Sequence, residues 1–216
     1  MSAAVDYPVS LAVEDFVPVL FTTAGVLLLG RIVPPARAVA AAVLIGAGGF
    51  AKATAKLIAA AGGPDLPWLR GMLFPLLALG FGVLCLELAR LRQGSTPRWL
   101  AVTVPALLTL CALGAVAARD PIPMLVSTTV FATITGVYLI DRARSQGDTV
   151  SAGLFGLQLL GFFILGPLAS REDQTVALQW VEQSCNTAAQ AAFLIGAWRI
   201  SATARTNADT GKEMIR

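Results

Sequence analysis

The sequence predicts an all-α integral membrane protein, a bundle of seven transmembrane helices. Of its 216 residues, 56% are hydrophobic and only 13% are charged, whereas soluble domains carry about 25% charged residues. The apolar residues fall in blocks of about 20, the length that a helix needs to cross the ~30 Å hydrocarbon core. The breaks between the blocks are too short to hold a separate soluble domain, so we expect one domain within the bilayer.

Seven apolar blocks are separated by breaks that contain proline, glycine or charged residues, the usual punctuation between helices. The chain after the last block is polar, so we predict a transmembrane domain over residues 1–200 and a cytoplasmic tail over 201–216. In chain order, the blocks are 10–30, 37–61, 69–89, 99–117, 122–140, 150–169 and 176–200.

Basic residues indicate the orientation. They concentrate in the first, third and fifth breaks and in the tail, while the other breaks carry acidic residues beside an arginine. By the positive-inside rule, the N-terminus is therefore outside and the C-terminus is cytoplasmic. Tryptophans near the block ends are typical of the aromatic belt at a membrane surface. Alanine-rich, lysine-poor composition favours a bacterial cytoplasmic membrane.

Two parts of the sequence resemble each other at an offset of about 110 residues. GVLLLGR (25–31) matches GVYLIDR (136–142), and GVLCLELAR (82–90) matches AAFLIGAWR (191–199). This predicts a parallel repeat of three helices on each side of a single linking helix, an architecture that some transporters use. Segments rich in alanine, leucine, glycine and valine also match by chance, so the repeat stays an open alternative.

The candidate site consists of the ionisable and amide side chains inside the blocks. Each charge costs on the order of 2.5–3.5 kcal/mol at the centre of a membrane helix, so a charge that the sequence keeps there indicates a functional site. Lys52 and Lys56 share one helix face, roughly 14 Å and 8 Å below its outer end. Glu182 belongs to a polar stripe on the last helix and lies roughly 9 Å deep, so we expect it to pair with Lys52. The predicted ligand-binding residues, which we expect to line a polar cavity open to the outside, are Glu14, Asp15, Lys52, Lys56, Gln158, Glu182, Gln183 and Asn186.

Three functions fit this pattern. The first is binding or transport of a small polar or anionic solute. The second is an accessory or scaffold subunit, with other membrane subunits as partners, in which the polar groups only fix helix packing. The third is an intramembrane enzyme acting on a lipid head group, for which Ser127 with Lys52 is the one conceivable dyad.

Several kinds of chemistry lack their residues. The chain has no histidine, the commonest general base and metal ligand, and no GxSxG, HExxH or Walker A motif. We therefore expect no metal or other cofactor, and favour a protein that is not an enzyme. The last block has no lysine that could form a Schiff base with retinal, which argues against a microbial rhodopsin. The net charge of +3 and the absence of a basic run argue against a nucleic-acid partner, which leaves the lipid bilayer as the main one.

Two smaller predictions concern pairing. Cys85, Cys111 and Cys185 all lie in apolar blocks, where thiols act as small apolar side chains; a disulfide between Cys111 and Cys185 is left open. Glu87 and Arg90 lie three residues apart near a block end, a spacing that favours a local ion pair on the helix surface.

Overall fold

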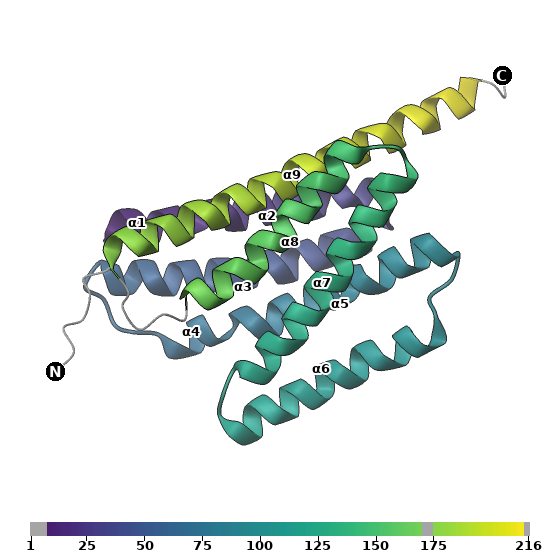
Figure 1. Cartoon of the computed structure of the whole chain (residues 1–216). Coiled ribbons are helices and arrows are strands. Elements are labelled where there is room, and N and C mark those ends of the chain that lie inside the picture. Colours follow the sequence, from purple (N-terminus) through teal and green to yellow (C-terminus); the bar gives the residue numbers. More distant parts are fainter. Residues whose placement is uncertain (1–7, 170–174, 214–216) are drawn as a thin grey trace.

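The computed structural model describes residues 8–169 and 175–213, and within them every regular element is a helix (Figure 1). The first apolar block is divided into α1 (Val9–Glu14) and α2 (Phe16–Leu28), which ends in the short η1 (Leu29–Arg31). The third block is divided likewise into α4 (Pro67–Gly71) and α5 (Leu73–Gln93). The other helices are α3 (Pro35–Ala60), α6 (Arg98–Ala118), α7 (Ile122–Ser145), α8 (Thr149–Ala169) and α9 (Val176–Glu213).

The predicted all-α membrane class is confirmed at the level of length and composition. Five helical segments in the described chain are long and apolar enough to cross a membrane: Val9–Arg31, Pro35–Ala60, Pro67–Gln93, Arg98–Ala118 and Ile122–Ser145. Thr149–Leu165 is a shorter apolar helix by the same measure. The helix α9 is not among these five segments, because the polar stripe on its first half lowers its hydropathy. The helix also continues past residue 200, so the predicted tail is helical as far as Glu213 and extends beyond the other helices (Figure 1).

Helix boundaries follow local sequence signals. Prolines begin α3 and α4, because the first helical position needs no N–H and suits the fixed φ of proline. Gly94 ends α5 with a left-handed φ of 76°, the usual conformation of a helix C-cap. Short connections of this kind make successive long helices antiparallel.

Six helices form a closed ring in which each packs against its two neighbours. In order around the ring they are α2, α3, α5, α7, α8 and α9, and α9 packs back against α2. The helix α6 lies outside this ring, against α7 and α5 (Figure 1). Its outward side chains are among the most exposed apolar ones, with Val116 at 78%, as expected of a helix that faces lipid.

Small residues allow the helices to approach closely. A Cβ added at Gly49 would lie 2.7 Å from Val19 of α2, and one added at Gly80 would lie 2.5 Å from Ile45 of α3. Such contacts between backbone and side chain are the usual role of glycine in membrane helices. Gly46 and Gly49 therefore lie on the face on which α3 meets α2.

The ring is solid in one half and hollow in the other. Apolar side chains from all six helices fill the half that contains the η1–α3 and α7–α8 connections, including Leu29, Leu84, Leu139 and Ile200. We call this the basic end, because arginines cluster there. The hollow half lies toward the opposite end, where α1 begins.

The predicted ion pair between Glu87 and Arg90 is wrong, and the disulfide that the sequence left open is not formed. Glu87 forms its ion pair with Arg37, at 3.6 Å, and not with Arg90, because the start of α3 lies beside the last turns of the antiparallel α5. All three cysteines are free. Cys111 lies on α6 outside the ring and Cys185 lies exposed on α9, so no disulfide joins them; Cys85 alone is fully buried.

Candidate ligand-binding site

Two adjoining cavities occupy the hollow half of the ring. The deep cavity has a volume of about 240 Å³ and the wide cavity about 560 Å³. The deep cavity reaches Phe81 and Ile45 at the edge of the apolar core, and the wide cavity reaches Lys56, Thr129 and Glu182 nearer the helix ends. Residues that line both cavities are Asp15, Lys52, Phe74, Leu77, Phe162, Asn186 and Gln190.

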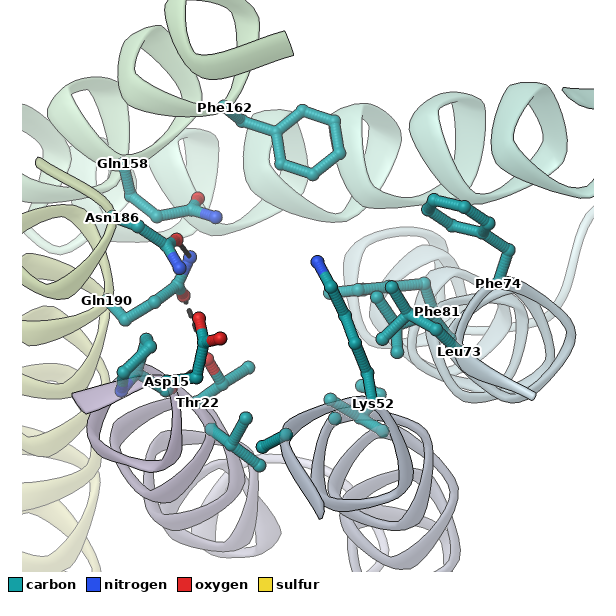
Figure 2. A pocket seen from close by; sticks show the side chains of 16 residues that line it. Asp15, Thr22, Lys52, Leu73, Phe74, Phe81, Gln158, Phe162, Asn186 and Gln190 are labelled. Atoms are coloured by element: carbon teal, nitrogen blue, oxygen red, sulfur yellow. Dashed lines mark hydrogen bonds between the residues drawn. The ribbon is translucent and has the colours of Figure 1, made fainter. Parts of the chain in front are cut away.

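Lys52 projects from α3 into this space. Its side chain points across the deep cavity toward Gln158 and Phe162 on α8 (Figure 2). Among the residues that the structure describes, no ion pair or hydrogen bond engages its ammonium group. A charged amine in a cavity of a membrane helix bundle is costly, so its placement calls for an explanation other than packing.

Lys56, one turn further along α3, is held differently. Its Nζ lies 2.7 Å from Oδ2 of Asp15, and the two side chains are 29% and 11% exposed. Asp15 stands at the break between α1 and α2, where the interrupted helix turns its carboxylate toward α3. This ion pair balances one positive charge beside the cavities.

Amide and hydroxyl groups form a polar corner on the far side of the deep cavity. The Thr22 hydroxyl donates to Oε1 of Gln190 at 2.9 Å, and Nε2 of Gln190 donates to Oδ1 of Asn186 at 3.5 Å. Gln158, only 8% exposed, completes the corner. Together these side chains present donors and acceptors to the same space as the ammonium of Lys52 (Figure 2).

The opposite wall is apolar. Leu73, Phe74 and Phe81 of α5 lie on the other side of Lys52 from the polar corner, and Phe162 of α8 closes the space above it (Figure 2). Ligand pockets commonly have this form, mostly apolar walls with a few polar groups that orient the ligand. The deep cavity thus has two chemically distinct sides, with an amine between them.

The structure brings most of the predicted site residues to these cavities. Asp15, Lys52, Gln158 and Asn186 line the deep one, and Lys56, Glu182 and Gln183 line the wide one. Nε2 of Gln183 is buried without a hydrogen-bond partner in the described chain.

Glu14 lines neither of the two cavities. Its Oε1 accepts a hydrogen bond of 2.6 Å from the Thr187 hydroxyl, and so it links α1 to α9. This arrangement gives Glu14 a role in helix packing.

The expected pair between Lys52 and Glu182 is not formed. Both residues line the wide cavity, but α9 packs against α2 and α8, and α3 packs against α2 and α5. The cavities therefore separate the two side chains. Asp15 does pair with a lysine of α3, namely Lys56.

Sequence reasoning omitted several lining residues. Gln190 continues the polar stripe one turn after Asn186, so its spacing could have included it. Thr22, Phe74, Phe81 and Phe162 carry no such signal, because threonines and phenylalanines are ordinary residues of a membrane helix. Ring packing alone directs them into the cavity.

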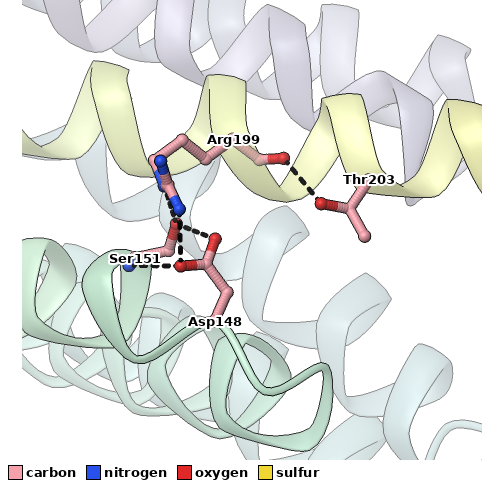
Figure 3. Close-up of polar contacts among 4 residues, drawn as sticks. All are labelled: Asp148, Ser151, Arg199 and Thr203. Carbon is pink, nitrogen blue, oxygen red and sulfur yellow. Dashed lines mark hydrogen bonds and ion pairs between the residues drawn. The ribbon is translucent and has the colours of Figure 1, made fainter.

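The basic end is closed by polar contacts between ring neighbours. Asp148 caps α8: its carboxylate accepts from the Ser151 amide at 3.0 Å and from the Ser151 hydroxyl at 2.6 Å. Arg199 of α9 donates to the same carboxylate at 3.1 Å (Figure 3). Partial burial of Asp148 opposes its ionisation, but the Ser151 and Arg199 contacts outweigh burial and lower the pKa of Asp148 to about 2.

Similar contacts join three other pairs of ring neighbours at this end. Arg37 pairs with Glu87 at 3.6 Å, and Arg92 pairs with Asp141 at 3.2 Å. The Ser201 hydroxyl donates to the carbonyl oxygen of Leu28 at 2.7 Å. The cavities are therefore separated from the basic end by the apolar core and this set of contacts.

The conceivable dyad of Ser127 with Lys52 is not assembled. Ser127 is fully buried, lines neither cavity, and donates its hydroxyl proton to the Met124 carbonyl at 2.9 Å. Among the described residues, no group of three or more histidine, cysteine, aspartate or glutamate side chains could hold a metal ion.

Comparison with known protein families, curated proteins and solved structures finds no match to this chain. Its function must therefore be argued from the cavity.

Proposed function

We propose that this chain crosses the membrane seven times, with the basic end in the cytoplasm and the N-terminus outside. Five segments are long and apolar enough to span, and α8 and α9 belong to the same ring, side by side with α7 and α2. The arginines of the basic end support the orientation through the positive-inside rule. On this orientation, the cavities lie in the outer half of the bilayer.

We also propose that the ring consists of two parallel repeats. Going around it, α2, α3 and α5 precede α7, α8 and α9 in the same order, so half a turn would exchange the two sets. The ion pair Arg37–Glu87 between α3 and α5 corresponds in place to Asp148–Arg199 between α8 and α9, with the charges exchanged. The external α6 is then the linking helix.

Within this framework, we propose that the protein binds, and moves across the membrane, a small polar or anionic solute that enters from outside. The observation that carries the proposal is the ammonium group of Lys52, which faces the deep cavity opposite Gln158 and Asn186. Intramembrane charges that line a cavity are typical of substrate pathways. The proposed site comprises Asp15, Lys52, Lys56, Gln158, Glu182, Gln183 and Asn186, with Glu14 as a supporting residue.

A scaffold subunit would account for part of the polar network but not for Lys52. The Lys56–Asp15 pair and the Thr22–Gln190 hydrogen bond join helices, as packing contacts should. Lys52 joins no helix to another among the described residues. A scaffold gains nothing from a cavity lined by an amine that is directed into it.

Binding of simple anions tests the proposal. Purified protein in nanodiscs is titrated with radiolabelled acetate and inorganic phosphate, and binding is compared for wild type, Lys52→Met and Lys52→Arg. We expect saturable binding that Lys52→Met reduces at least tenfold and Lys52→Arg largely retains. Arg70→Gln is the matched control, since it removes one positive charge from an exposed pair outside the cavities. Equal binding by wild type and folded Lys52→Met would refute the proposal.

A further inference from the structure

The two sides of the deep cavity differ in a way that constrains what can occupy it. Thr22, Asn186 and Gln190 form the polar corner between α2 and α9, whereas Phe74 and Phe81 form an apolar wall on α5. A fully hydrated ion would make no apolar contact with the wall on α5, and a hydrocarbon would leave the amides and the amine without hydrogen-bond partners. An occupant that suits both sides has one polar end and one apolar end.

The charge of the polar end follows from the ionic groups at the deep cavity, whose lining does not include Glu182 of the wide cavity. Lys56 and Asp15 balance each other in a 2.7 Å ion pair, and Lys52 adds one ammonium group between the corner and the wall (Figure 2). One carboxylate would match this charge, and the amide groups of Gln158 and Asn186 can donate to its remaining lone pairs. A second negative charge would meet the Asp15 carboxylate, and the described residues that line the deep cavity offer no cation besides Lys52.

We infer that the ligand is a small amphipathic monoanion, a carboxylate with an apolar or aromatic body. Its head binds between Lys52 and the polar corner, and its body packs against Phe74, Phe81 and Phe162. The combined cavities fall in the size range of small-molecule sites, about 300–1,000 Å³. This inference rests on the proposed function and narrows it from small anions in general to anions that carry a hydrocarbon or aromatic group.

The expected preference for a longer carboxylate can be estimated from the length of its hydrocarbon chain. Burial of one methylene group from water contributes about fourfold in affinity. Hexanoate has four more methylene groups than acetate and the same head group. Burial of even half of them should make hexanoate bind at least tenfold more tightly than acetate.

The test measures binding of radiolabelled acetate, hexanoate and 1-hexanol to nanodiscs with and without the protein, so that partition into lipid is subtracted. For wild type we expect hexanoate to bind at least tenfold more tightly than acetate. Lys52→Met should abolish most hexanoate binding, and hexanol, which has the chain but no charge, should show no loss in that variant. Phe74→Ala should weaken hexanoate binding by a larger factor than acetate binding, because Phe74 belongs to the apolar wall against which only the longer chain can pack.

Each other outcome overturns a different statement. If acetate and hexanoate bind equally, and both depend on Lys52, the amphipathic inference fails while the anion site stands. If hexanol binds as hexanoate does and neither depends on Lys52, the cavity is a site for neutral apolar compounds and the inference fails. If no anion binds to wild type, the proposed function fails as well.

Discussion

Lys52 and Phe162 face each other across the central cavities, from helices α3 and α8 on opposite sides of the ring (Figure 2). The two positions are about 110 residues apart, the offset at which the two parts of the sequence resemble each other. If the ring is a repeat, one half contributes a cation and the other contributes an aromatic ring at the same place.

The Lys56–Asp15 pair should behave as a coupled unit. Lys56→Met should lower the free energy of unfolding by roughly 2 kcal/mol, less than the ~3–5 kcal/mol for a fully buried pair, because Lys56 is 29% exposed. Adding Asp15→Asn should recover part of that loss. The double-mutant cycle is measured by unfolding in detergent, and additive effects would show that the pair contributes nothing.

A second double-mutant cycle provides a comparison for the Lys56–Asp15 pair. Lys52→Met combined with Glu182→Gln should show a smaller coupling than the Lys56–Asp15 cycle, because the cavities lie between these two side chains. An equal or larger coupling would show that Lys52 and Glu182 interact directly, as their predicted depth in the membrane suggests.

Asp148 should make the stability of the basic end depend on pH. Its pKa is lowered from 3.8 to about 2 in the folded protein, so the ionised carboxylate stabilises the fold above about pH 4. This stabilisation is lost as the pH falls through about 2. Asp148→Asn should cost about 1–2 kcal/mol at pH 7, discounted because Arg199 is partly exposed, and nothing below pH 2.

The measurement is the unfolding midpoint of wild type and Asp148→Asn between pH 7 and pH 2. The two curves should converge as the pH falls. Asp65→Asn is the control, since Asp65 belongs to an exposed pair with Arg70 at the other end and should shift the midpoint little. A constant gap between wild type and Asp148→Asn would contradict the assigned pKa.

Close helix contact at Gly80 predicts opposite effects for two glycine-to-alanine changes. A Cβ at Gly80 would lie 2.5 Å from Cγ1 of Ile45 and 3.0 Å from the Ala41 carbonyl oxygen, so Gly80→Ala should destabilise by about 1–3 kcal/mol. At Gly153 in α8, nothing lies within 4 Å of an added Cβ. Gly153→Ala should therefore stabilise by up to about 1 kcal/mol. Thermal unfolding in detergent compares the two, and equal effects would argue against the contact between α3 and α5.

The proposed orientation predicts which connections are accessible from each side of the membrane. In a background without the three native cysteines, Ala36→Cys and Ser145→Cys at the basic end should react with an impermeant maleimide only from the cytoplasmic side. Pro64→Cys at the opposite end should react only from outside. All three positions are exposed, so failure to react would not reflect burial. The reverse pattern would invert the orientation and place the cavities in the cytoplasmic half.

The helices and the side chains that share a helix face were predictable from the sequence, whereas the order in which the helices pack was not. The length and apolarity of the blocks determined that the chain forms membrane helices, because every backbone polar group in a bilayer must be satisfied within a helix or a closed barrel. Helical periodicity placed Lys52 and Lys56 on one face, and both line the wide cavity. These inferences depend only on residues a few positions apart.

The order of helices around the ring was decided by tertiary packing alone. It separates Lys52 from Glu182, brings Asp15 to Lys56, and pairs Glu87 with Arg37 in place of Arg90. It also leaves α6 outside and turns Phe74 and Phe162 inward. Many apolar helix faces can pack against one another at similar free energy, so the choice depends on small residues such as Gly49 and Gly80 that let particular helices approach. That choice sums many contacts between distant segments, and no single stretch of sequence contains it.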